Sequence, residues 1–100
     1  MKKGSSNAVE SAKHCREIKI VNKFGIHARP AALFVKTASR FKADILVEKD
    51  GMSVNGKSIM GLLTIQGQNG AVVKVTAEGP DAAGALKALQ ELIEQKFHED

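Results

Sequence analysis

The segment GIHARPA, residues 25–31, combines residue types that together can handle a phosphoryl group. His27 supplies an imidazole, a ring that is partly neutral near pH 7 and therefore serves well as a relay nucleophile. Arg29 follows two residues later, and its permanently charged, planar guanidinium fits phosphate oxygens. A phosphorus–nitrogen bond is labile, so a group bound to imidazole is passed on rather than stored. The segment therefore indicates a phosphohistidine relay.

The residues that follow His27 predict a helix that would complete an anion site. Apolar side chains recur every three to four positions over residues 28–41, which is the period of an amphipathic helix. The first N–H groups of a helix lack partners and attract anions, and Pro30 fits the first turn because it has no N–H to lose. A capping or loop histidine without a chemical role stays open for His27 on spacing alone. His14 and His98 lie near the chain ends, where we expect no role.

Ser58 is the second residue that could carry chemistry. It precedes an apolar run, the position typical of a helix N-cap. Phosphate is also favourable there, since its negative charge meets the positive end of the helix, and a stable phosphoserine ester suits regulation rather than relay. A short helix cannot bury Ile59, Met60, Leu62 and Leu63 together, so we expect one or two of them to stay exposed as a docking surface.

The stretch GMSVNGKS, residues 51–58, fits the P-loop pattern G-x-x-x-x-G-K-[ST] but lacks its context. A P-loop joins a buried strand to a long helix. Here Gly51 follows Asp50 in a hairpin turn signal, and MSV reads as the returning strand, whose backbone groups would be used in a sheet. We therefore interpret the match as a hairpin that meets a helix start, and not as a nucleotide site.

The remaining patterns give an element order of βαββαβα. A central hairpin and the short length favour an α+β fold, with a small, mostly antiparallel sheet and helices on one face. Asp81 is expected in the first turn of the last helix, where the helix dipole favours a carboxylate. The predicted strands are residues 17–22, 43–49, 52–54 and 71–77, and the predicted helices are residues 28–41, a short helix from residue 58, and residues 79–97.

Composition and charge exclude several function classes. With 43% hydrophobic and 26% charged residues, the chain has the balance of an ordinary globular domain, and nothing approaches eighteen consecutive apolar residues. The net charge of +4 is concentrated in residues 1–16, which carry +3, while residues 17–100 carry +1. A nearly neutral domain without Tyr or Trp argues against direct nucleic-acid binding.

We divide the chain into a flexible N-terminal extension, residues 1–16, and one domain, residues 17–100. The extension is polar and lacks the apolar segment of a secretory signal, which favours the cytoplasm and no membrane insertion. Cys15 is the single cysteine, so no internal disulfide forms, and we expect an exposed thiol. The adjacent pair of His14 and Cys15 is a poor metal site without further ligands, and we expect neither a metal nor a cofactor.

The motifs GIHARPAA and NGKSIMGLL together resemble the HPr family, the histidine-containing phosphocarriers of the bacterial phosphoenolpyruvate-dependent sugar phosphotransferase system. The likeness covers roughly residues 17–98. It implies an open-faced β-sandwich, with a four-stranded, mostly antiparallel sheet and three helices on one face. It also implies a monomeric carrier that is a substrate of other enzymes and has no turnover of its own.

The resemblance assigns roles to individual residues. His27 matches the histidine that takes a phosphoryl group at Nδ1 from enzyme I and passes it to IIA components, and Arg29 matches the arginine that supports this transfer. Ser58 matches the serine that HPr kinase/phosphorylase modifies in many bacteria, which impedes the relay and can recruit a transcriptional regulator for catabolite repression. The positions at which the family docks its partners are Ala28, Ala32, Ile59, Met60 and Leu63.

Two alternatives to a sugar-linked carrier remain. The first is a regulatory HPr-like module that acts through Ser58 and protein binding, with little sugar transport. The second is a nitrogen-related branch of the same phosphotransferase chemistry. The presence of His27 favours the carrier, because a purely regulatory relative could lose its imidazole without penalty. Two features depart from the family pattern. The extension has no counterpart in the usual short form, and Phe24, which directly precedes Gly25, stands at a position where family members vary.

Overall fold

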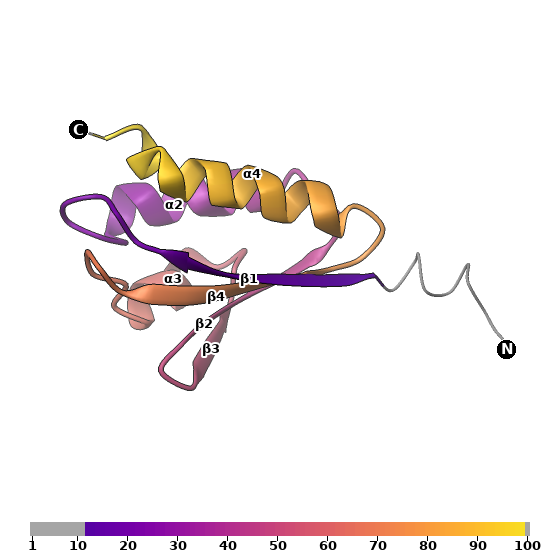
Figure 1. Cartoon of the computed structure of the whole chain (residues 1–100), viewed down its shortest axis with the longest axis horizontal. Helices are drawn as coiled ribbons and strands as arrows, with labels where there is room; N and C mark the ends of the chain where they lie inside the picture. The colour runs from indigo at the N-terminus through magenta and orange to yellow at the C-terminus, as the bar shows by residue number, and fades with distance from the viewer. Residues whose placement is uncertain (1–11, 100) are drawn as a thin grey trace, which may run out of the picture.

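A computed structural model describes residues 12–99 of the chain (Figure 1). None of the helices in these residues is long and apolar enough to cross a membrane. The elements, in chain order, are β1 (Lys13–Lys19), α2 (Ala28–Ala38), β2 (Asp44–Lys49), β3 (Met52–Asn55), α3 (Ile59–Thr64), β4 (Val72–Glu78), α4 (Ala82–Glu94) and the 3-10 helix η1 (Lys96–His98).

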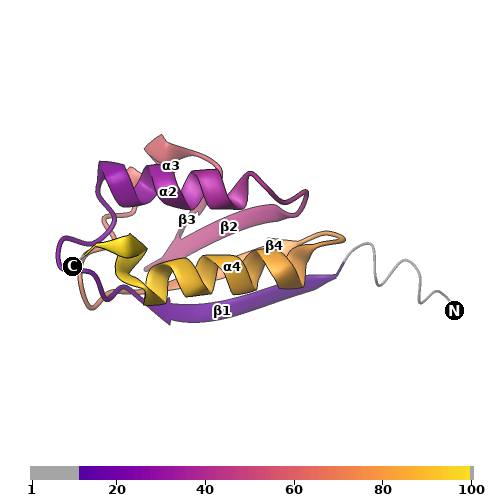
Figure 2. The same ribbon diagram turned by 90° about the horizontal axis from the view of Figure 1, so that it is seen from above.

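The four strands form one sheet in the order β1-β4-β2-β3, and every neighbouring pair is antiparallel. Helices α2 and α4 lie side by side over one face of this sheet, and α3 packs on the other side of α2 (Figure 2). The predicted α+β fold with three helices and an open-faced sandwich is thus confirmed. The loop before α2, the loop after α3 and the C-terminal residues meet at one end of the molecule (Figure 1).

The core lies between the sheet and the helices because apolar side chains recur with period two on the strands and near 3.6 on the helices. Val47, Val73 and Val75 are buried on the sheet, and Phe34 on α2 belongs to the same buried cluster. The stripe predicted for the last helix is also buried, although its final member belongs to η1; this stripe is Leu86, Leu89, Ile93 and Phe97.

Strand β1 begins earlier than the sequence predicted. Residues 13–16, which we assigned to a flexible extension, are part of the sheet and pair with residues 75–78 of β4. Their side chains are exposed, so no alternation of apolar and polar residues marks them as a strand, and pairing with β4 determines their structure instead. Cys15 lies in this strand with its thiol exposed, as expected. The remainder of the predicted extension, residues 1–11, lies outside the described residues.

The hairpin interpretation of residues 51–58 is confirmed. Asp50 and Gly51 form the turn with positive φ angles of 51° and 81°, and Met52–Asn55 pairs with β2. The backbone of the apparent P-loop is therefore used in the sheet.

Asp81 occupies a different place from the one predicted. It lies at the N-cap position of α4, not in the first turn, and its carboxylate does not cap the helix. Its two oxygens instead accept hydrogen bonds from the backbone N–H groups of Lys42 and Ala43, each at 2.8 Å. These bonds, that of Lys42 foremost, lower the pKa of Asp81 below its usual value. Asp81 therefore ties α4 to the chain that enters β2.

Candidate functional site

His27 is held by a tight contact between two loops. The Ile26 N–H donates to the Gly67 carbonyl at 2.7 Å, and Gly25 has a φ of +67°, which L side chains rarely adopt. A Cβ on Gly25 would lie 2.2 Å from the Gly67 oxygen, so only glycine fits. His27 follows as the N-cap residue of α2, with extended backbone angles, and its side chain does not cap the helix.

The N-terminus of α2 offers hydrogen-bond donors beside the imidazole. The Ala31 N–H donates to the His27 carbonyl at 2.9 Å, and Pro30 has no N–H. Within residues 12–99, no hydrogen bond engages the N–H groups of Ala28 and Arg29. Two donors, together with the partial positive charge of the helix end, therefore face an anion that binds next to His27.

Positive side chains surround the same place. A shallow pocket of about 340 Å³ is lined by Lys23, Phe24, Arg29, His98 and Glu99. Of these five residues, only Arg29 is predicted from the sequence to act at this site. The Lys23 ammonium lies 5.2 Å from the centroid of the Phe24 ring, and that ring meets the His27 ring edge to face at 6.4 Å. The pocket thus holds two cations, and two of its lining residues, Phe24 and Glu99, contact the ring of the candidate nucleophile.

A carboxylate reaches His27 from the end of the chain. Glu99 Oε2 lies 3.1 Å from His27 Nε2, and Glu99 Oε1 accepts a hydrogen bond of 2.9 Å from Asn22 Nδ2. Glu99 and Asn22 are not predicted from the sequence, because both contacts join residues more than 70 positions apart and no local pattern indicates them. His98, for which we expected no role, is also among the residues that line the pocket.

Ser58 is the N-cap of α3, as predicted. Its Oγ accepts a hydrogen bond from the Gly61 N–H at 3.0 Å, and its backbone is extended. This contact satisfies one of the free donors of the helix start, which is the structural role of a capping serine. The side chain is half-buried. Phosphorylation at Ser58 stays a prediction.

The prediction that part of the apolar run stays exposed is confirmed. Met60 is 74% and Ile59 40% exposed, whereas Leu62 is buried and Leu63 half-buried. Ala28 and Ala32 are exposed on α2, the helix against which α3 packs. An apolar surface therefore spans parts of both helices; its use in docking stays a prediction.

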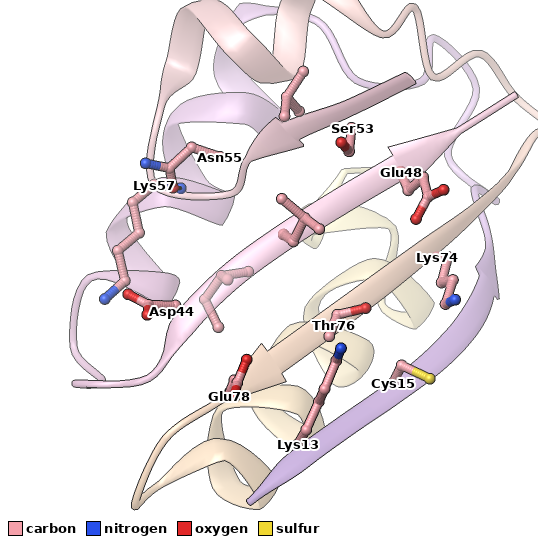
Figure 3. A pocket seen from close by; sticks show the side chains of 13 residues that line it. Lys13, Cys15, Asp44, Glu48, Ser53, Asn55, Lys57, Lys74, Thr76 and Glu78 are labelled. Carbon is pink, nitrogen blue, oxygen red and sulfur yellow. Dashed lines mark hydrogen bonds between the residues drawn. The ribbon is translucent and has the colours of Figure 1, made fainter. Parts of the chain in front are cut away.

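The uncovered face of the sheet carries a separate hollow, of about 570 Å³ (Figure 3). Side chains of both charges line it, among them Lys13, Asp44, Glu48, Lys74 and Glu78. They come from β1, β2 and β4, and His27 is not among the lining residues. No group of three His, Cys, Asp or Glu side chains in the described part of the chain could hold a metal ion. The hollow therefore offers mixed charge but no recognisable chemistry.

Comparison with known proteins gives consistent matches. Residues 14–95 match the family model described as the PTS HPr component phosphorylation site. The phosphocarrier protein HPr of Treponema pallidum is 41% identical over 85 residues, which cover 85% of this chain and 97% of that protein. The HPr-like protein Crh of Halalkalibacterium halodurans is 43% identical over 81 residues, which cover 81% of this chain and 96% of that protein.

Solved structures agree with these matches. The crystal structure of HPr-C-His from Thermoanaerobacter tengcongensis has a TM-score of 0.84 and 55% identity, and the alignment covers 87% of this chain and 98% of that chain. A crystal structure of an HPr dimer from the same organism has a TM-score of 0.70 and 50% identity, covering 99% of this chain and 100% of that one.

Proposed function

Because the chain belongs to the HPr family of phosphocarrier proteins, we propose that His27 accepts a phosphoryl group from phosphorylated enzyme I and passes it to IIA components of sugar permeases in the cytoplasm. The observation that carries this proposal is the position of the imidazole. It stands at a helix start whose first N–H groups have no partner in residues 12–99, and it contacts Phe24 and Glu99, which line a pocket together with Lys23 and Arg29.

The geometry suggests how the transfer proceeds. Within the described residues Nδ1 of His27 has no hydrogen-bond partner, so its lone pair is available to the phosphorus atom. The transferred group carries negative charge on three oxygens, which the Ala28 and Arg29 N–H groups and the guanidinium can neutralise. The protein supplies the acceptor and part of the charge stabilisation, and the partner enzyme completes the site. The chain is then a covalent carrier and not an enzyme with turnover.

Intact-mass measurement tests the carrier function. The purified protein is incubated with phosphoenolpyruvate and enzyme I, beside the variants Ser58→Ala and His27→Ala. We expect one phosphoryl addition that acid removes, present in the wild type and Ser58→Ala and absent from His27→Ala. An addition that persists in His27→Ala would place the group elsewhere and would contradict the proposal.

A regulatory role at Ser58 is the second candidate, favoured by the likeness to Crh and by the N-cap position of the serine. In this role HPr kinase/phosphorylase modifies Ser58, and the modified protein binds a transcriptional regulator; a nitrogen-related branch would likewise use the chain as a regulator. An acid-stable addition from ATP and the kinase that requires Ser58, with no addition from phosphoenolpyruvate, would favour this role over the carrier.

The exposed apolar surface of α2 and α3 is the proposed docking site for enzyme I, the IIA components and the kinase. It comprises Ala28, Ala32, Ile59, Met60 and Leu63. We expect the protein itself to be a monomer, although related HPr and Crh structures include dimers. Light scattering coupled to size-exclusion chromatography checks this, and a mass of two chains at micromolar concentration would refute it.

A further inference from the structure

The carboxylate of Glu99 bridges the imidazole and a buried amide. One oxygen lies 3.1 Å from His27 Nε2, and the other accepts from Asn22 Nδ2 at 2.9 Å. The Glu99 side chain is only 19% exposed, against 42% for the imidazole. An exposed ion pair contributes little, but here the carboxylate is largely shielded and both of its oxygens have partners. Such a contact fixes how the imidazole is oriented and which nitrogen bears a proton.

Asn22 is placed to hold this carboxylate. It is fully buried, and Nδ2 also donates to the Gly25 carbonyl at 2.8 Å. Both atoms that contact Nδ2, the Gly25 carbonyl oxygen and Glu99 Oε1, are acceptors, so the positions of the amide nitrogen and oxygen cannot be exchanged. Its Oδ1 is buried and has no partner in the described residues, which costs stability. A residue selected for stability alone would not leave that oxygen unpaired, so the useful part of Asn22 is the amide donor that faces Glu99.

The backbone after α4 brings Glu99 to this place. Lys96, Phe97 and His98 all have positive φ angles, of 58°, 54° and 62°. This left-handed conformation is unfavourable for each residue with a side chain. Phe97 is 1% exposed and anchors the turn in the core. The turn directs the chain back over the His27 loop and places Glu99 beside the imidazole.

From this geometry we propose that Glu99 is a positioning residue for phosphoryl transfer. Its carboxylate accepts the Nε2–H of His27, which keeps the proton on Nε2 and leaves the lone pair on Nδ1 as the nucleophile. The proposal rests on the proposed carrier function and adds the group that selects the reacting nitrogen. The N–H groups of Ala28 and Arg29, which have no partner within residues 12–99, and the cations of the pocket offset the repulsion between this carboxylate and the incoming phosphoryl group.

The step balances without a further reactant. The Nδ1 lone pair forms the bond to phosphorus while the bond between phosphorus and the donor breaks, and that electron pair leaves with the donor. Nε2 keeps its proton, so the ring becomes a phosphorylated imidazolium, whose positive charge the Glu99 carboxylate stabilises. In the next transfer the Nδ1–phosphorus pair returns to the ring, and His27 regains its neutral form.

Two substitutions separate positioning from a merely structural role. Glu99→Gln keeps the shape but has only one carbonyl oxygen for two donors. The buried Asn22 amide takes that oxygen, since an unpaired buried donor is costly. The new NH₂ group then donates to His27 Nε2, which moves the ring proton to Nδ1. Glu99→Ala removes both contacts and leaves a mixture of the two tautomers. Glu91→Gln, an exposed carboxylate on α4, is the control for loss of charge.

Long-range ¹H–¹⁵N spectra of histidine-labelled, unphosphorylated protein at pH 8.5 report the tautomer without any partner. We expect the Nε2–H form in the wild type and Glu91→Gln, the Nδ1–H form in Glu99→Gln, and a mixture in Glu99→Ala. Phosphoryl acceptance from enzyme I should fall at least about a hundredfold in Glu99→Gln, because the nucleophile is protonated, and less in Glu99→Ala. A structural role predicts the reverse order, since Gln is the closer match in shape.

Each other outcome overturns the proposal. The proposal is refuted if the wild type has the Nδ1–H form, or if the tautomer is unchanged in both Glu99 variants. It is also refuted if the Glu99 variants accept the phosphoryl group as fast as the wild type or faster. If the wild type accepts no phosphoryl group from enzyme I, the carrier function fails and this step fails with it. If the wild type is phosphorylated and the Glu99 variants accept the phosphoryl group as fast as the wild type does, only the role of Glu99 is refuted. Circular dichroism of all variants confirms that they are folded.

Discussion

Replacing Gly25 with alanine should disturb both the fold and the relay, because this glycine lets two loops touch behind His27. Alanine at a φ of +67° costs roughly 1–2 kcal/mol in backbone energy. The methyl group would also lie 2.2 Å from the Gly67 oxygen and 2.7 Å from Gln68 Cα, so the loops must separate. Separation breaks the hydrogen bond from the Ile26 N–H to Gly67, which contributes about 0.5–1.5 kcal/mol.

The total for Gly25→Ala is about 1.5–3.5 kcal/mol of unfolding free energy, or roughly 6–28 °C in Tm for a domain of this size. Gly70→Ala is the matched control. The φ of Gly70 is +89°, and a Cβ there would meet no atom within 4 Å. Gly70→Ala therefore loses stability only through the unfavourable backbone conformation. Urea denaturation of both variants gives the difference that the loop collision causes. Under conditions where Gly25→Ala is folded, phosphoryl acceptance at His27 should still fall, since the loop that carries the imidazole has moved.

Equal destabilisation by Gly25→Ala and Gly70→Ala would refute the reasoning about the collision. Normal phosphoryl acceptance by a destabilised Gly25→Ala variant would show that the loop contact supports the fold but not the position of His27. Gly51→Ala, which also lacks neighbours within 4 Å, gives a second measure of the backbone cost.

Three further predictions concern single side chains. Arg29→Glu should slow phosphoryl acceptance about 10²–10³-fold and change the unfolding free energy by only about 0.5 kcal/mol, because the side chain is exposed; equal losses in stopped-flow transfer and urea denaturation would contradict its role. Ser58→Asp should weaken binding to enzyme I roughly tenfold in calorimetry by placing charge beside an apolar surface while keeping the cap; unchanged affinity would leave Ser58 as a cap alone. The hydrogen bond from the Lys42 N–H is the largest cause that lowers the pKa of Asp81 in the folded protein. The ionised carboxylate therefore stabilises the fold at a pH above the unfolded-state pKa of about 3.9, and this stabilisation is lost as the pH falls through the lower folded-state pKa. The stability difference between the wild type and Asp81→Asn in urea should therefore shrink between pH 5 and pH 2, and a difference independent of pH would show that the carboxylate charge does not matter.

The sequence predicts the parts of this protein whose signals are local. His27, Arg29 and Ser58 each lie at or next to the start of a helix, so a few neighbouring residues are enough to predict their positions in the fold. The alternation of buried and exposed residues likewise indicates β2 and β4.

Contacts between distant residues could not be predicted in this way. Glu99 reaches His27 only because three successive residues adopt positive φ angles, which no residue type there signals. The start of β1 was missed because the side chains of residues 13–16 are exposed and show no alternation of apolar and polar types, whereas their pairing with β4 holds them extended. Both misses have the same physical origin, a tertiary contact that decides local structure.

The order of strands in the sheet has a consequence for folding kinetics. In the described sheet β1 has β4 as its only neighbour, and β4 is the last strand in the chain. The first strand therefore cannot pair until the last one is available, and closing so long a loop makes folding slower than in a domain of the same size with mainly local contacts. Since β1 leads directly into the loop of His27, a chain that has not yet paired β4 has no anchored acceptor. If His27 is the acceptor that we propose, phosphoryl transfer requires a sheet in which β1 and β4 have paired.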